Sequence, residues 1–203
     1  MSDRISNRWR AVAVAVIMVG LFAWPALAGA QAVTGQATAV QATVFSLLGG
    51  TTTVLADTGP LGGSAGPPLL ASALTGAVPS LLTGDVLHAT TIGSPDQVAS
   101  EASLADLVLS VAGTTIGADF VLGRAQAVLG GAGAGSSNIG NLSINGVPIP
   151  VTGGPNQTIP IPGGQVTVNE QQISAAQTVV NALHVIVYGV ADVVIGSATA
   201  GIQ

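Results

Sequence analysis

The stretch NIGNLSINGVPIPVTGGPNQTIPIPGGQVTVNEQ, residues 138–171, carries the clearest folding signal in the chain. Asn145-Gly146 separates two short runs in which apolar and polar residues alternate. Because both central residues of a tight hairpin turn adopt positive φ, this dipeptide predicts a β-hairpin. Gly163-Gly164 stands in the same way between TIPIP and QVTVNE and predicts a second hairpin. The stretch therefore indicates an antiparallel sheet.

Four prolines in this stretch indicate where its strands lie. Pro148 and Pro150 are two residues apart, as are Pro160 and Pro162, so each pair lacks its backbone donors on one side of its strand. Proline is tolerated in a sheet only at an edge or a bulge. These strands are expected to rim the sheet and to resist further pairing on the proline side.

Outside this stretch, abundant valine and threonine, with Gly and Pro between short runs, favour many short strands. We expect an all-β fold, an antiparallel β-sandwich. Residues 32–56 are typical of a strand, a Gly-Gly turn and a second strand. The proline- and glycine-rich residues 58–68 predict a loop.

Two segments are harder to interpret. Residues 98–129 have helix-like leucine spacing, but Gly117 and Gly123 would each cost about 1 kcal/mol inside a helix. Two long strands with a turn after Gly113 are therefore favoured. Residues 69–87 have no clear period and leave one helical turn or two short strands open.

The first 30 residues resemble an export signal. Three arginines precede an unbroken apolar run, and the small residues after that run offer cleavage after Ala28, Ala30 or Ala32. The apolar run is shorter than the roughly 20 residues that a membrane-spanning helix needs, so a cleaved signal peptide is favoured over an anchor. We expect residues 1–30 to be a signal peptide and residues 33–203 to form one all-β domain that is secreted, extracellular or associated with the cell surface.

Composition limits what such a domain binds. Outside the signal segment the only basic residue is Arg124, against eight acids: Asp57, Asp85, Asp96, Glu101, Asp106, Asp119, Glu170 and Asp192. Nucleic acid is not an expected partner, because neutralising phosphates takes clustered Lys and Arg. An anionic lipid surface is not expected after signal cleavage for the same reason. The chain has no cysteine, so disulfides, thiolate metal sites and a cysteine nucleophile do not arise.

Four blocks in the second half occur in an order that resembles a known family. They are ASEASLADLVLSVAGTTIGADFVLGRAQAVLGG, SSNIGNLSINGVPIPV, PNQTIPIPGGQVTVNEQ and VVNALHVIVYGVADVVIGSATAGI. Over roughly residues 99–202 the chain resembles the bacterial choice-of-anchor P family, exported domains whose members carry different surface anchors. The resemblance implies a secreted or surface-associated module and no particular reaction.

Two features depart from that family pattern. Ser197-Ala198-Thr199 stands where a histidine is expected. The residues before Gln203 contain no LPxTG-like motif, closing apolar segment or basic tail. We therefore expect no paired histidines and no covalent anchor in this sequence.

The run NALHVIVYGVADVVIGSATAGI, residues 181–202, holds the candidate polar site. Alternate side chains of a strand share a face, which groups His184 with Ala182, Ile186 and Tyr188. Gly189-Val190 fits a two-residue type II′ turn, which would place Asp192 on the face away from His184. A three-residue loop from Gly189 to Ala191 would instead gather all three polar residues on one face. Turn chemistry favours the first arrangement, so we expect a half-exposed His184 beside a hydrogen-bonded Tyr188 and no His184–Asp192 dyad.

The remaining motifs predict no chemistry. His88 would need further ligands to hold a metal, and the other histidine of the chain, His184, is distant in the sequence. Glu101 and Asp106 lack the spacing of a calcium-binding loop. The pattern G-x-S-x-G occurs as GGSAG at residues 62–66, inside the proline- and glycine-rich segment predicted to be a loop and without the strand-to-helix setting of a nucleophile elbow. No phosphate-binding loop with its lysine occurs. Asn141 and Asn156 head sequons that indicate exposed turns. We assign no catalytic, cofactor-binding or metal-binding residue and expect all eight acids to lie on a solvated surface.

These observations favour a structural or interaction module without catalytic activity or cofactor. Its partners would be cell-surface components, or a second copy bound through a sheet edge. The alternative enzyme is a metal-assisted hydrolase in which His88, His184 and an acid converge. A third hypothesis is a self-assembling surface polymer in which residues 33–47 pair with a neighbouring subunit's sheet edge.

Overall fold

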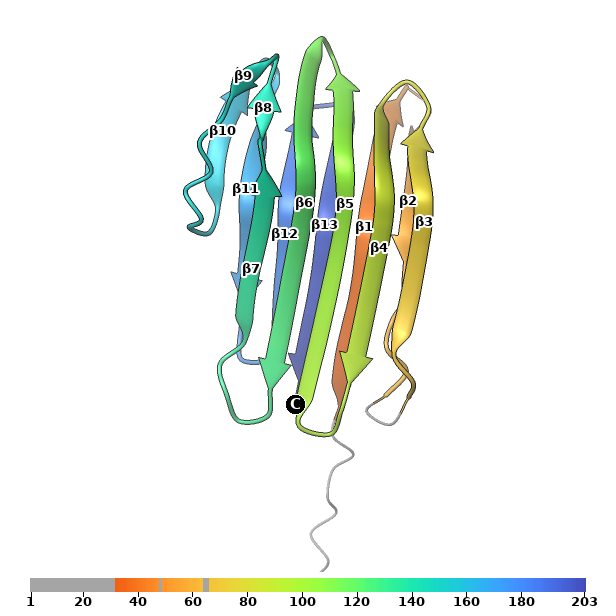
Figure 1. The fold of residues 1–203 in the computed structure, drawn as a ribbon, viewed down its shortest axis with the longest axis vertical. Coiled ribbons are helices and arrows are strands. Elements are labelled where there is room, and N and C mark those ends of the chain that lie inside the picture. Colours follow the sequence, from red (N-terminus) through yellow and green to blue (C-terminus); the bar gives the residue numbers. More distant parts are fainter. Residues whose placement is uncertain (1–31, 48, 64–65) are drawn as a thin grey trace, which may run out of the picture.

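The computed structural model describes residues 32–47, 49–63 and 66–203. The expected signal peptide, residues 1–30, lies outside the described residues. The described chain forms two antiparallel sheets packed face to face (Figure 1). The expectation of an all-β antiparallel sandwich is confirmed. The described part of the chain contains no helix that is long and apolar enough to span a membrane.

Sheet A has six strands in the order β10-β11-β12-β13-β1-β2. Its first and last strands in sequence, β1 and β13, lie side by side near its middle. The strands are β1 (Val33–Ser46), β2 (Gly49–Asp57), β10 (Gln157–Ile161), β11 (Gly164–Ile173), β12 (Gln177–Val187) and β13 (Ala191–Ile202). β1 pairs with both β13 and β2 of its own chain, so it is an internal strand of sheet A. The hypothesis that residues 33–47 pair with a neighbouring subunit's sheet edge stays a prediction.

Sheet B has seven strands in the order β3-β4-β5-β6-β8-β9, with β7 also paired to β6. They are β3 (Leu69–Val78), β4 (Leu82–Gly93), β5 (Gln97–Val111), β6 (Thr114–Val128), β7 (Ala134–Gly140), β8 (Ser143–Ile144) and β9 (Val147–Pro148). The two long strands expected in residues 98–129 are confirmed as β5 and β6. Residues 69–87, left open by the sequence, form β3, the turn at residues 79–81 and the first part of β4.

The proline-containing strands rim the sandwich, as expected. Pro148 ends β9 at one edge of sheet B, and Pro160 lies in β10 at one edge of sheet A. The Asn145-Gly146 turn joins β8 to β9, and both residues have positive φ. The second hairpin turns one residue earlier than expected, because Ile161 pairs with Gly164 and leaves Pro162-Gly163 as the turn.

The two sheets approach closely at a waist formed by Gly123 of β6 and Gly196 of β13. A Cβ atom added to Gly123 would lie 2.0 Å from the carbonyl oxygen of Gly196. Three buried alanines, Ala37, Ala89 and Ala102, form a small apolar cluster of their own, apart from two larger ones. The larger clusters are rich in Leu, Val and Ile and contain no aromatic residue. The core is therefore divided into two parts by small residues.

The pleat of sheet A is interrupted along one transverse row. The residues left without a partner in the register of neighbouring strands are Ala39, Ala56, Asn169, Ala182 and Gly196. Ala56, Asn169 and Gly196, on alternate strands, have positive φ. On each of β1, β12 and β13 the buried positions shift by one residue at this row. Side chains beyond the row therefore point to the opposite face from the one that strict alternation predicts.

Candidate functional site

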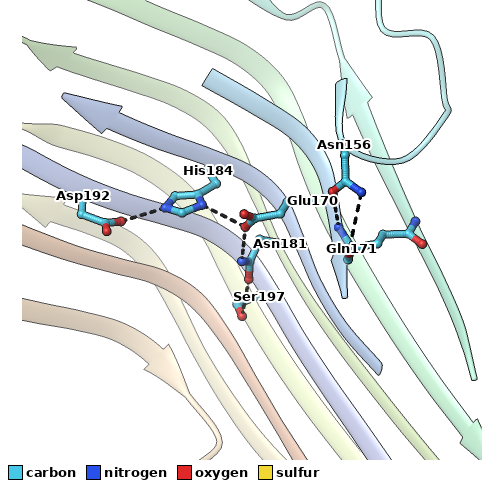
Figure 2. A network of polar contacts seen from close by, with 7 residues as sticks. All are labelled: Asn156, Glu170, Gln171, Asn181, His184, Asp192 and Ser197. Atoms are coloured by element: carbon cyan, nitrogen blue, oxygen red, sulfur yellow. Dashed lines mark hydrogen bonds and ion pairs between the residues drawn. The ribbon is translucent and has the colours of Figure 1, made fainter. Parts of the chain in front are cut away.

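A chain of polar side chains crosses the outer face of sheet A (Figure 2). His184 on β12 contacts two carboxylates: its Nδ1 lies 2.9 Å from Oε2 of Glu170, and its Nε2 lies 2.9 Å from Oδ1 of Asp192. Asn181 donates to the same Glu170 oxygen at 2.6 Å and accepts a 2.8 Å hydrogen bond from the Ser197 hydroxyl. The five residues come from β11, β12 and β13, so the network joins three adjacent strands.

The interrupted pleat brings these residues to one face. Asn181 and His184 are three residues apart, and a regular strand would place them on opposite faces. Ala182 and Leu183 between them are both fully buried, because the alternation shifts at this point. Ala182 therefore points into the core, and its expected place on the His184 face is wrong.

The turn between β12 and β13 also differs from the expected one. Val187 pairs with Ala191 and Ile186 with Asp192, which leaves the three residues from Tyr188 to Val190 as the loop. The expected two-residue turn, and with it the separation of His184 from Asp192, is wrong. The tyrosine backbone NH donates to Gly163 at 2.9 Å, and this contact with the next hairpin accompanies the longer loop.

The expected environment of the histidine is wrong as well. The His184 side chain is only 15% exposed and is held by carboxylates, whereas Tyr188 is 67% exposed in the turn. Glu170 is also largely covered, with a 24% exposed side chain. The expectation that all eight acids are solvated therefore fails for this residue.

The geometry fixes what His184 can do. Each ring nitrogen faces a carboxylate oxygen at 2.9 Å, so neither nitrogen is open to a nucleophile or a metal. The Ser197 hydroxyl donates to Asn181 and not to the imidazole. The arrangement cross-links strands and does not form a serine–histidine pair.

His88 lies on the outer face of sheet B, in β4, where it pairs with Ser72 and Ser103 of the neighbouring strands. His184 projects from the outer face of sheet A, because Leu183 and Val185 beside it point into the core. The two histidines therefore lie on opposite surfaces of the sandwich. Within the described ranges no group of three or more His, Asp and Glu residues has the geometry of a metal site.

A shallow trough of about 450 Å³ lies over β4 to β7 on sheet B. Its lining includes Thr90, Ile92, Ala99, Gln126 and Ser136. Arg124 and Glu101 also line it, and the Arg124 guanidinium donates through Nε to Glu101. Arg124 is thus already paired, and Glu101 has a role separate from that of Asp106, its partner in the calcium hypothesis.

The two sequon asparagines lie in turns, as expected. Asn141 and Asn156 both have positive φ. The Asn141 side-chain amide donates to Asp119 at 2.6 Å, and the side-chain Oδ1 of Asn156 accepts from the backbone NH of Gln171 at 2.9 Å (Figure 2). These side chains complete strand ends and are explained by local structure.

Comparison of the chain with protein-family models, curated proteins and solved structures finds no match.

Proposed function

We propose that the chain is a secreted or cell-surface-associated structural or interaction module without catalytic activity, similar in role to the choice-of-anchor P domains that its second half resembles. The observation that carries this proposal is the placement of His184. Both of its ring nitrogens are bonded to carboxylates, so this polar cluster acts as a clamp across three strands. A general base needs a ring nitrogen free to take a proton from its substrate.

The alternative of a metal-assisted hydrolase receives no support from the geometry. It requires His88, His184 and an acid in one site, and the two histidines occupy opposite faces of the sandwich. A catalytic zinc also needs about three protein ligands around one open position. Glu170 and Asp192 bond to different nitrogens of the His184 ring. The two carboxylates and one ring nitrogen therefore do not face a common point where a metal ion could bind.

Two measurements test the proposal. The full chain is expressed in a bacterial host, and intact mass together with fractionation shows where the product accumulates and whether the chain has been cleaved after Ala28, Ala30 or Ala32. We expect a trimmed product outside the cytoplasm. The purified protein is then assayed on chromogenic esters, glycosides and phosphate esters, with and without added Zn²⁺, beside the His184→Ala variant. Turnover that His184→Ala abolishes would contradict the non-catalytic role.

A further inference from the structure

The open edge of sheet B is the feature that the proposed function leaves unexplained. At the other rim, β9 and β10 carry prolines, which block pairing. The edge strand β3, residues 69–78, contains no Pro, Lys, Arg, Asp or Glu. Its backbone pairs with β4 alone, and among the described residues no hydrogen bond from outside the sheet reaches positions 69–77. Long uncharged edges of this kind are templates for strand addition.

The side chains of this edge are unusual for a solvated strand. Leu70 is 67% exposed and Leu74 is 85% exposed. They share the outer face with Ser72, because Ala71 and Ala73 between them pack toward the core clusters. Two leucines therefore flank a serine along one free edge, with no charge near them on the strand.

The sequence of this edge is its own mirror image. Residues 70–74 read Leu-Ala-Ser-Ala-Leu, so an antiparallel copy centred on Ser72 places Leu70 against Leu74 of the copy, and alanine against alanine. An interface around a two-fold axis must be self-complementary in this way. The palindrome is the reason to choose a second copy of this chain, rather than a different protein, as the occupant.

We propose that two copies of the protein dimerise by antiparallel pairing of their β3 strands about Ser72, joining the two B sheets into one continuous sheet. This inference names the partner of the interaction module and so rests on the proposed function. One strand pair buries little surface, which places the dimer among weak associations, below about 1,200 Å² of interface. The dimer is therefore concentration-dependent.

A single cysteine tests the register directly, because the chain has none of its own. At a two-fold centre the two copies of residue 72 have Cα atoms about 4.5–5.5 Å apart, which lies within the about 4.4–6.8 Å range of disulfides. Ser72→Cys in the full chain, purified in its processed form, is expected to give a disulfide-linked dimer on mild oxidation. Ala77→Cys is the matched control on the same strand. Its two copies would lie ten residues apart in register, about 33 Å, and should stay monomeric.

Association without a covalent bond is measured by sedimentation equilibrium. Leu74→Lys is expected to weaken the dimer about tenfold or more, because the two-fold axis makes each substitution act twice. Ala77→Lys should leave it unchanged. Far-UV circular dichroism of both variants should match the native protein, since these side chains are exposed.

Three results would overturn the dimer. They are a native protein that stays monomeric up to about 1 mM, cross-linking of Ala77→Cys as fast as that of Ser72→Cys, or a dimer that Leu74→Lys leaves intact. An inert protein that is monomeric removes this inference and leaves the proposed function standing. A dimeric protein whose turnover depends on His184 would support this inference and contradict the proposed function.

Discussion

Replacing Gly123 with alanine tests whether the two sheets meet at their backbones. The added Cβ would lie 2.0 Å from the Gly196 carbonyl oxygen and 3.1 Å from its carbonyl carbon. Carbon and carbonyl oxygen normally approach no closer than about 3.3 Å, so the shortfall is more than 1 Å. Both atoms belong to hydrogen-bonded central strands, and no flexible side chain can move aside.

The cost follows from how the sheets must respond. They have to separate locally by about 1 Å, and a gap of that size forfeits about a quarter to a half of the dispersion energy of the atoms beside it. Overpacked cores lose about 1–3 kcal/mol, occasionally more. Because backbone meets backbone, we expect Gly123→Ala to lower the free energy of unfolding by about 3 kcal/mol or more, at the upper end of that range.

The measurement is equilibrium unfolding in urea followed by far-UV circular dichroism. Gly140→Ala, in the neighbouring β7, is the matched control, because its Cβ would meet nothing closer than 3.8 Å. It should change the stability by no more than about 0.5 kcal/mol. Adding Ala182→Gly to Gly123→Ala should give no rescue, since the obstacle is a carbonyl oxygen and not the Ala182 methyl group. If the Gly123→Ala protein were as stable as the Gly140→Ala protein, the backbone contact between the two sheets at the waist would be refuted.

Two further predictions concern buried polar groups. His184→Ala should lower the free energy of unfolding by about 1–2 kcal/mol, because it leaves Glu170 and Asp192 without their shared hydrogen-bond partner. The control, His88→Ala, should stay within about 0.5 kcal/mol of the native protein. Equal losses of stability in urea unfolding of the two variants would contradict the clamp. Thr178→Val should raise the free energy of unfolding by about 1 kcal/mol, since the fully buried Thr178 hydroxyl has no hydrogen-bond partner among the described residues. Thr91→Val, equally buried but bonded to Ser100 at 3.1 Å, should instead destabilise the protein, and matching thermal shifts in the two threonine variants would count against this reasoning.

Sequence patterns predicted the sandwich because its strands are bounded by turn residues whose chemistry is local. Asn145 and Gly146 readily adopt the positive φ that a tight hairpin turn needs. The prolines of β9 and β10 mark edge strands because they lack a backbone donor, which is a local property. The division of residues 98–129 into β5 and β6 followed from glycines that a helix would not tolerate. Each of these signals depends on the conformational preference of one or two residues.

The polar network was beyond the same reasoning for a definite physical cause. Grouping side chains by strict alternation assumes an unbroken pleat, and the pleat breaks between Asn181 and His184. The signal for that break was present only as Gly196, an isolated glycine in a valine-rich strand, which often marks a bulge or close backbone approach. The loop after β12 likewise contacts a second hairpin through the Tyr188 backbone, and local turn rules do not take such a contact into account.

The interrupted row explains the unusual composition as well as the network. Where Gly123 and Gly196 bring two backbones into contact, no ring fits between the sheets, and the residues around them are alanines. The aromatic residues of the described chain accordingly lie at the surface: Phe45 is 45% exposed, Phe120 37% and Tyr188 67%. The same row shifts the pleat so that Asn181 and His184 face outward together. A single backbone feature thus requires small side chains at the waist and creates the polar clamp above it, so a variant that restores regular alternation should lose both.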